Sequence, residues 1–514
     1  MDIIAELKRL PPAGVVVACV AVGWYLSLFV YRLHLHPLAK FPGPKLAALS
    51  KWYEFHYEVV QRGQFSRHIS ELHEKYGPVV RITPHELHVK DSSLWDTLYA
   101  KHPKTDKYAW MNGRFGNHGS IFTTSDQALH RLRRSALNPM FSKRAIGQFE
   151  PFVRGKVDFF CDRIAKYKGT GEVLAVNKLW NAYAGDVITE YSFGFNYDHL
   201  ASEDFKETFH DAFMAVSEFG HIALQFPWVT PLLNMLPDDM VQKMNPPLEK
   251  LLQLQRDLQK TIFRIGQERD QMDKQPKQPT IFHEILQSDL PSQEKMLKRL
   301  GDEAQTIIGA GLTTTAWALT NIMYYVLADT QIHATLRKEL HDAVPDLSSP
   351  DALSFQKLEQ LPFLRACIRE GIRLSHGVTA RNPRVLSVPL TYDEWTIPPQ
   401  TPVSMTITDV HFDPEIYPNP TEFVPDRWMS NPKAQDGNSL DRYFVAFGKG
   451  PRLCLGINLA YLELFTAIGS IFRRFRFELY ETDLSDVIIV HDFFLPSPKL
   501  DSKGVRVKVV NVES

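Results

Sequence analysis

Cys454 lies in a stretch of ten residues, Phe-Gly-Lys-Gly-Pro-Arg-Leu-Cys-Leu-Gly, which begins at Phe447. The glycines and the proline predict a bent loop, and the apolar run after Gly456 predicts a helix. Backbone N–H groups on such a loop and at a helix N-terminus stabilise anions, so we expect them to lower the pKa of this thiol. A thiolate with no cysteine or histidine nearby does not fit a zinc or iron–sulfur cage, but it fits an axial ligand of haem iron. The alternative is a buried cysteine beside a glycine turn.

Two charged pairs have the spacing of a helix face. His130 and Arg134 are four residues apart, and Glu370 and Arg373 are three apart, so each pair shares one face of a predicted helix. A basic pair can hold carboxylates through charge-assisted hydrogen bonds, although a solvated basic helix shows the same spacing. An acid–base pair of this kind is commonly a surface ion pair that contributes little stability.

A segment of small residues lies within the long helix predicted near 299–328. It reads Gly-Ala-Gly-Leu-Thr-Thr-Thr from Gly309 to Thr315, and glycine and threonine are poor residues for a helix interior. Small side chains let a ligand approach the backbone, and threonine hydroxyls can bond a carbonyl one turn back and bend or open the helix. An ordinary contact between helices is the alternative.

The loop around Cys454 resembles the haem-binding loop of the cytochrome P-450 family. That family's pattern is Phe-x-x-Gly-x-Arg-x-Cys-x-Gly, and the chain meets it at Phe447, Gly450, Arg452, Cys454 and Gly456. The resemblance extends from about residue 41 to about residue 509. It implies the family's fold, mainly α with a small β portion, and heme b (iron protoporphyrin IX) with the thiolate of Cys454 as iron ligand.

The resemblance also implies roles for residues outside the loop. Four positions at which the family binds the haem propionates correspond here to His130, Arg134, Arg381 and Arg452. Arg384 is the near competitor for Arg381. The family joins its Glu-x-x-Arg pair to the arginine of a Phe-x-Pro-x-Arg segment, which implies a buried structural triad of Glu370, Arg373 and Arg427.

The threonine segment matches the family's oxygen-side helix with one departure. The pattern Ala/Gly-Gly-x-Asp/Glu-Thr-Thr/Ser makes Thr314 the threonine beside bound oxygen, and it places Thr313 where the family has an acid. The acid usually helps to pass protons toward the oxygen. Its absence predicts a relay through Thr313, water or substrate, or a reaction that needs fewer protons.

By this resemblance the protein is a haem-thiolate monooxygenase that uses O2 to hydroxylate or epoxidise its substrate. No flavin- or nicotinamide-binding domain is evident in the sequence, so electrons from NADPH must come through a membrane-bound flavoprotein reductase. Arg131, Arg133 and Lys449 are candidates for steering that partner, or belong to a solvated face. A haem-thiolate isomerase that needs no reductase is the first alternative, and a haem-binding sensor is the second.

The predicted substrate is a lipophilic small molecule, because apolar and aromatic residues are the candidates for the walls of the pocket. These candidates, each of which could equally belong to the core, are Tyr108, Trp110, Phe115, Ile121, Phe122, Phe213, Phe219, Phe226, Phe493 and Phe494. The similarity to filamentous-fungal members of the family indicates a secondary metabolite. A terpenoid is the first choice and a polyketide-derived compound the second.

Composition limits the partners and the compartment. The chain has 514 residues, a formal net charge of −1 and four scattered cysteines. This charge gives no general reason to bind nucleic acid, and the cysteines do not suggest a disulfide framework, which favours a reducing compartment. We expect a monomer.

The N-terminus predicts a membrane anchor. Residues 13–31 carry no charge, and this run is long enough to cross a bilayer at about 1.5 Å per residue. We expect residues 1–12 in the lumen, 13–31 as a retained transmembrane anchor, 32–45 as a basic, proline-rich hinge, and 46–514 as the monooxygenase domain. The basic residues after the run place that domain on the cytosolic side of the endoplasmic reticulum membrane. A cleaved signal peptide or a buried helix is the alternative.

Helical periodicity dominates the elements that must position these residues. Helices are predicted near 66–76, 126–137, 149–168, 247–270, 299–328, 331–343, 355–375 and 456–474. Short strands are predicted at 79–83, 87–89, 402–405, 487–490 and 505–509. The sheets therefore combine segments that are far apart in the chain.

Overall fold

The computed structural model describes residues 13–101, 105–206, 208–233, 235–237, 240–241, 243, 246–270, 280–349 and 351–513. Its helices are α2 (Ala13–Val30), α3 (Lys45–Leu49), α4 (Trp52–Phe55), α5 (Phe65–Tyr76), α6 (Gln127–Leu137), α7 (Lys143–Ala165), α8 (Val176–Phe193), α9 (His210–Gln225), α10 (Val229–Leu233), α12 (Leu248–Asp270), α13 (Ile281–Gln287), α14 (Leu297–Ala328), α15 (Thr330–Ala343), α16 (Phe355–Leu358), α17 (Pro362–Ser375), α18 (Ile407–His411) and α19 (Ile457–Arg474).

The strands are short and fewer than the helices. They are β1 (Val79–Arg81), β2 (Leu87–Val89), β3 (Thr105–Lys107), β4 (Leu174–Ala175), β5 (Arg384–Leu386), β6 (Leu390–Tyr392), β7 (Trp395–Ile397), β8 (Pro402–Ser404), β9 (Phe475–Leu479), β10 (His491–Phe493), β11 (Leu495–Ser497) and β12 (Arg506–Val512). The predicted fold class, mainly α with a small β portion, is confirmed.

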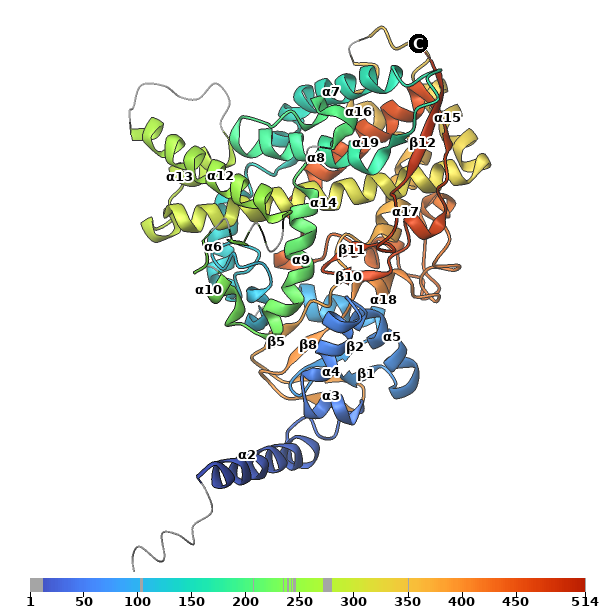
Figure 1. Cartoon of the computed structure of the whole chain (residues 1–514). Coiled ribbons are helices and arrows are strands. Elements are labelled where there is room, and N and C mark those ends of the chain that lie inside the picture. Colours follow the sequence, from blue (N-terminus) through green and yellow to red (C-terminus); the bar gives the residue numbers. More distant parts are fainter. Residues whose placement is uncertain are drawn as a thin grey trace, which may run out of the picture.

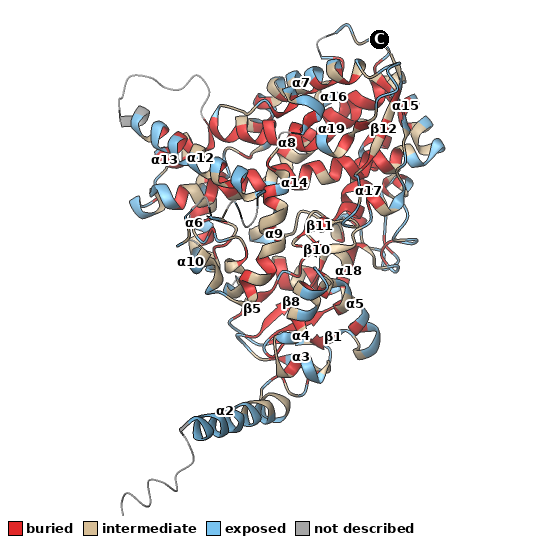
Figure 2. Cartoon of the chain, in the orientation of Figure 1, coloured by how far each residue is buried: buried red, intermediate tan, exposed pale blue. Residues whose placement is uncertain are grey.

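Helix α14 crosses the helical body from one side to the other (Figure 1). Helices α8, α12, α17 and α19 pack against it. Figure 2 shows that α8 is buried along nearly its whole length, so its apolar residues do not follow a helical period. Sequence periodicity therefore missed α8, and it missed α9 as well. The helix predicted at 355–375 is two helices, because Pro362 begins α17 at its first helical position.

The main sheet combines distant segments, as predicted. Its strand order is β1-β2-β8-β5-β3, in which β2 and β8 are parallel and the other pairs are antiparallel. A three-stranded sheet, β4-β12-β9, and the pairs β6–β7 and β10–β11 complete the β portion. The strand predicted at 487–490 is wrong: Val487 follows a 3-10 turn, and β10 begins only at His491.

Helix α2 projects from the body, and its side chains are exposed (Figures 1 and 2). Residues Gly14–Leu35 form a candidate membrane span of 22 residues with a mean hydropathy of 2.0. The predicted hinge joins the body directly, because Phe41 is buried in the core and the N–H of Arg81 donates to the carbonyl of Pro42. The predicted lumenal segment, residues 1–12, lies outside the described residues.

Candidate active site

Cys454 faces a cavity of about 410 Å³ that α14, α9, α19 and the loop of residues 115–122 help to line. Its loop bends back so that the N–H of Cys454 donates to the carbonyl of Phe447, at 2.8 Å. Gly448 and Gly450 have φ values of +69° and +68°. A Cβ at Gly450 would lie 2.5 Å from the carbonyl oxygen of Tyr99, so this position admits only glycine. Gly456 precedes α19, which places the thiol at the mouth of that helix.

The electrostatic environment of Cys454 differs from the sequence prediction. Burial raises the pKa of the thiol, whereas the backbone N–H of Gly456 and the charge of Arg134 lower it, and burial prevails. The accessible surface of this side chain faces the cavity, where little water can solvate a thiolate. A bound metal ion would reverse the balance, because a coordinating thiol is deprotonated.

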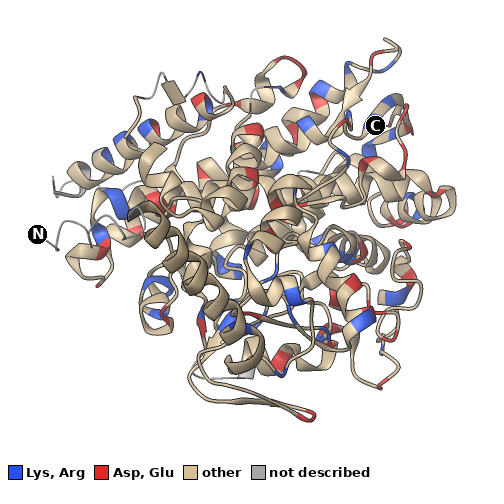
Figure 3. Ribbon diagram, turned by 60° about the horizontal axis from the view of Figure 1, so that its bottom comes forward, with Lys and Arg blue, Asp and Glu red and all other residues tan. Residues whose placement is uncertain are grey.

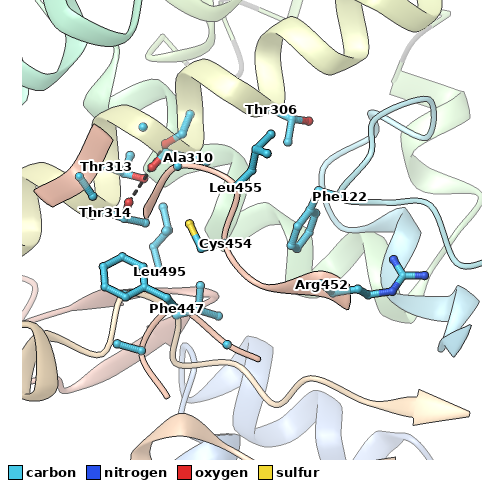
Figure 4. A pocket seen from close by; sticks show the side chains of 18 of the residues that line it. Phe122, Thr306, Ala310, Thr313, Thr314, Phe447, Arg452, Cys454, Leu455 and Leu495 are labelled. Atoms are coloured by element: carbon cyan, nitrogen blue, oxygen red, sulfur yellow. Dashed lines mark hydrogen bonds between the residues drawn. The ribbon is translucent and has the colours of Figure 1, made fainter. Parts of the chain in front are cut away.

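Thr313 and Thr314 lie on α14 across the cavity from Cys454 (Figure 4). Their hydroxyls donate to the carbonyls of Gly309 and Ala310 respectively, each at 2.7 Å. Helix α14 remains continuous through the segment, so these bonds do not open it. The structure therefore corrects the expectation that the threonines would interrupt the helix.

The two glycines of the segment serve contacts between helices. A Cβ at Gly309 would lie 2.6 Å from the ring of Phe213 on α9, and one at Gly311 would lie 2.5 Å from Ile188 on α8. The alternative considered from the sequence therefore explains the glycines. Both glycines also line the cavity, together with Ala310 and Thr314.

A basic cluster lines another part of the cavity and consists of Lys107, His130, Arg384 and Arg452. Lys107 on β3 and Arg384 on β5 stand directly opposite each other in the antiparallel pair, an arrangement that destabilises a sheet when both residues carry the same charge. The guanidinium of Arg452 donates to the carbonyls of Thr124 and Ser125, at 2.7 and 2.6 Å, and its Nε is buried without a partner.

Burial and the charges of neighbouring cations lower the pKa values of residues in the basic cluster. Burial and the charge of Arg452 lower the pKa of His130 to about 3. Burial and the charge of Arg384 lower the pKa of Lys107 well below its usual value and that of Arg452 to about 10. Glu463 is the one carboxyl group among the described lining residues, and burial raises its pKa well above the usual range.

These properties fit an anionic, metal-bearing cofactor. Cations that cluster in a cavity wall and form no ion pair among the described residues call for an anion that balances their charge, and the two propionates of haem would meet this need at Lys107, Arg384 and Arg452. Cys454 would then supply the iron ligand from the loop of residues 447–456. Fold and site together define a haem-thiolate protein.

Arg381 is a correction to the predicted propionate set. It lies outside the cavity lining, and it is buried against carboxylates: its Nη2 donates to Glu54 at 2.5 Å and its Nε to Glu86 at 2.9 Å. Burial alone would lower its pKa, but the charges of Glu54 and Glu86 raise the pKa well above the usual value. Arg384, the competitor named from the sequence, lines the cavity instead.

Arg134 borders the cavity, but its guanidinium is engaged by the protein. It donates to the carbonyl of Leu453, at 2.5 Å, and to the side chain of Asn138, at 3.1 Å. It therefore supports the loop beside Cys454. Lys107 was missed from the sequence, because only the pairing of β3 with β5 reveals that a second cation stands opposite it.

The structure brings Glu370, Arg373 and Arg427 together. Arg373 donates to both oxygens of Glu370, at 2.9 and 2.7 Å, and Arg427 donates to Oε1 at 2.9 Å. Trp428 and the N–H of Val424 donate two further bonds, at 2.8 and 3.0 Å. Burial opposes ionisation of Glu370, but the hydrogen bonds and charges of the arginines hold its pKa below the usual value.

Five of the ten residues predicted for the pocket walls line the cavity: Phe115, Ile121, Phe122, Phe213 and Phe494. The other five, Tyr108, Trp110, Phe219, Phe226 and Phe493, are not part of the lining. Trp110 instead donates its indole N–H to the carbonyl of Leu224, and Phe493 is buried.

Comparison with known proteins identifies the family. The cytochrome P450 family model matches residues 42–503. The chain is 51% identical to cytochrome P450 monooxygenase sdnE of Sordaria araneosa, over 96% of this chain and 98% of that protein. It is 41% identical to tryptophan 6-hydroxylase fscE of Fusarium equiseti, over 97% of each chain, and 39% identical to N-acetyltryptophan 6-hydroxylase ivoC of Emericella nidulans, also over 97% of each. The chain belongs to the cytochrome P450 family and is a monooxygenase of that family.

Proposed function

We propose that this monooxygenase hydroxylates or epoxidises a lipophilic small molecule of fungal secondary metabolism. The observation that carries the proposal is the opposition of Cys454 and Thr314 across a cavity whose remaining walls are largely apolar. A terpenoid is the first candidate and a polyketide-derived compound the second. The names of two relatives, which specify hydroxylation of tryptophan and of N-acetyltryptophan, support an aromatic ring as a further target.

Each residue of the site contributes a defined step. Haem, when bound, supplies the activation of O2 and the transfer of one of its oxygen atoms to the substrate, while electrons from NADPH reduce the other to water. Cys454 would hold the iron, and Lys107, Arg384 and Arg452 would hold the propionates, with His130 beside them. The hydroxyl proton of Thr314 is directed to the carbonyl of Ala310, so its oxygen can accept a hydrogen bond from water in the cavity. Thr313 cannot act as an acid, and protons would pass through hydroxyls and water.

The proposed partners and location rest on the candidate membrane span at Gly14–Leu35 and on the redox partner that membership of the P450 family implies. We place the enzyme in the endoplasmic reticulum membrane as a monomer with a single span, with its catalytic domain in the cytosol and a flavoprotein reductase that supplies electrons from NADPH. Lys and Arg are interspersed with Asp and Glu over the body (Figure 3). Arg133 and Lys449 are weak candidates for steering, because they pair with Glu294 and Asp96; Arg131 is exposed.

The isomerase remains the second candidate, because the neutral Thr313 replaces an acid in the proton relay. A rearrangement without net reduction of O2 needs neither that acid nor a reductase. The two functions therefore predict opposite dependence on NADPH.

Deletion of the protein in its host, followed by identification of the accumulated precursor, tests the proposal. The purified precursor is then supplied to the enzyme with reductase, NADPH and isotopically labelled O2. We expect a product that carries one labelled oxygen atom and forms only with NADPH. Conversion without NADPH would establish the isomerase, and no conversion under any condition would favour the sensor.

A further inference from the structure

Three polar side chains lie in the cavity wall away from Cys454. Asn117, Ser217 and Gln305 all line the cavity, and they are only 4%, 2% and 8% exposed. Polar side chains buried to this extent nearly always have hydrogen-bond partners. Groups that remain unused here indicate a ligand or bound water that satisfies them.

Each of the three keeps an unused group. The hydroxyl of Thr306 donates to the carbonyl of Asp302 at 2.9 Å, so it must accept from Asn117 Nδ2, which leaves Asn117 Oδ1 buried without a partner. Gln305 Oε1 accepts from Gln255 at 2.8 Å, and the amide nitrogen of Gln305 has no protein partner in the described part of the chain. The hydroxyl of Ser217 likewise has none among those residues.

The packing of α9 brings these groups toward one place. The ring of Phe213 covers Gly309 on α14, and Gly220 contacts Arg114 in the loop that leads to Asn117. Ser217 lies about one turn from both Phe213 and Gly220. This spacing puts Ser217, which also lines the cavity, on the face of α9 between those two contacts.

The junction at which Asn117 bonds Thr306 is separated from the reactive position by a defined length of helix. Thr306 lies on α14 about one turn before Ala310 and about two turns before Thr314 (Figure 4). At a rise of about 1.5 Å per residue, the polar junction is roughly 6 Å from Ala310 and roughly 12 Å from Thr314 along the axis. A substrate with a rigid apolar body could reach both.

The charge around the junction favours a neutral group. Among the described residues, the lining of α9, α14 and residues 115–122 includes no charged side chain. Asp302 and Glu303 lie behind the same turn of α14, where they bind the N–H groups of Gly119 and Ile121. Neither acid lines the cavity, and Glu303 is also paired with Arg299 at 2.6 Å. A substrate carboxylate would therefore find no counter-charge in this part of the described lining, whereas a hydroxyl can donate to Asn117 Oδ1 and accept from the amide nitrogen of Gln305.

We propose that Asn117, Ser217 and Gln305 form a subsite for a neutral hydroxyl group, alcohol or phenol, at the end of the substrate away from the oxidised carbon. The inference rests on the proposed function, because it deepens the description of the substrate. It makes the substrate amphipathic: an apolar body lies against Phe213 and Ala310, and its hydroxyl is held by the subsite.

The test uses the full-length ferric holoenzyme and three probes: 2-naphthol, naphthalene and 2-naphthoate. Each probe's dissociation constant is measured by displacement of 4-phenylimidazole from the haem. We expect 2-naphthol to bind at least fivefold more tightly than naphthalene and 2-naphthoate to bind most weakly. In the triple variant Asn117→Leu, Ser217→Ala, Gln305→Met, which removes all three polar groups of the subsite, the preference for 2-naphthol over naphthalene should disappear. The control, Val216→Ala, borders the same wall and should weaken both probes by the same factor.

Equal affinity for 2-naphthol and naphthalene in the unmodified enzyme would overturn the subsite and leave bound water as the partner of these groups. Preference for 2-naphthoate, or a preference for 2-naphthol that survives in the triple variant, would also overturn it. NADPH-dependent turnover is measured separately. Its absence, with the preference for 2-naphthol intact, would contradict the proposed function but not the subsite.

Discussion

The two sides of the cavity differ in how they are constructed. The side that bears Cys454 concentrates charge: Lys107, Arg384 and Arg452 all line it, and none of them forms an ion pair among the described residues. Glu463, the one carboxyl group in the described lining, has a pKa that burial raises well above the usual range. The side formed by α9 and α14 carries no charge and offers apolar surface with a few hydroxyl and amide groups. The first side is incomplete without an anionic cofactor, whereas the second can accept many ligands. This difference explains why the cofactor is far easier to identify than the substrate.

Replacement of Cys454 tests the charged side most severely. Cys454→Ser should abolish the absorbance of the reduced carbon monoxide complex that is typical of thiolate haem, together with NADPH-dependent turnover, because a serine hydroxyl does not replace the soft ligand. Cys19→Ser, in the exposed helix α2, is the control and should retain both. Persistence of the thiolate signal in Cys454→Ser would disprove the ligand assignment.

Replacement of Glu370 should destabilise the fold, because it removes the carboxylate that binds Arg373 and Arg427. Glu370→Ala leaves two buried arginines without their counter-charge and should cost about 3–5 kcal/mol, so little folded, haem-loaded protein should be recovered. Asp342→Ala, which breaks the exposed pair with Lys338, is the matched control and should change stability by less than about 1 kcal/mol. Urea titration measures both. A normal yield of stable, haem-loaded Glu370→Ala would refute the structural role.

Arg384→Met separates the two candidates for propionate binding. Loss of one charge-assisted bond, worth about 1.5–3 kcal/mol, should accelerate haem transfer to apomyoglobin by roughly tenfold or more. The haem-free protein should lose little stability, because the relieved repulsion of Lys107 offsets the lost hydrogen bond from Arg384 to Asn382. Arg381→Met should instead destabilise the fold, since Glu54 and Glu86 lose their partner. Rapid haem loss from a stable Arg381→Met, with Arg384→Met unchanged, would restore the original assignment.

Replacement of Thr314 tests the uncharged side of the cavity, which α9 and α14 form. Thr314→Ala should reduce the product formed per NADPH consumed by several-fold, because the cavity loses the hydroxyl that orders water opposite Cys454. Thr313→Ala should have a smaller effect, since that side chain is buried and directed to Gly309. Equal coupling in both variants would show that protons reach the oxygen by another route.

The pH dependence of the haem-free protein should show the smallest effect. The pKa of His130 is about 3 in the folded chain and about 6.5 in an unfolded one. Between these two pH values the unfolded state binds a proton at this histidine and the folded state does not. The free energy of unfolding should therefore fall as the pH is lowered from about 6.5 toward 3. His130→Gln should reduce this slope in urea titrations at pH 7 and 5, and the exposed His56→Gln is the control. An unchanged slope in His130→Gln would contradict the buried, neutral state.

Local sequence predicted some elements well and missed others for identifiable reasons. Amphipathic helices such as α5, α12 and α14 appeared within two residues of their observed bounds. Helix α8 gave no periodic signal because it is buried on nearly every side. The run at 487–490 has the composition of a strand, but only its last residue bonds a strand: the N–H of Val490 donates to the carbonyl of Ser497 in β11.

The sequence by itself predicted the loop around Cys454 and the pair of Glu370 and Arg373, because both depend on residue types at fixed short spacings. The link from this pair to Arg427 came from the resemblance to the family. Only the tertiary structure decided which cations face the cofactor. Arg381 and Arg384 are three residues apart and chemically identical, yet one is neutralised by Glu54 and Glu86 while the other stands opposite Lys107. The polar junction at Asn117, Ser217 and Gln305 arises in the same way, from three segments that only the packing of α9 on α14 brings together.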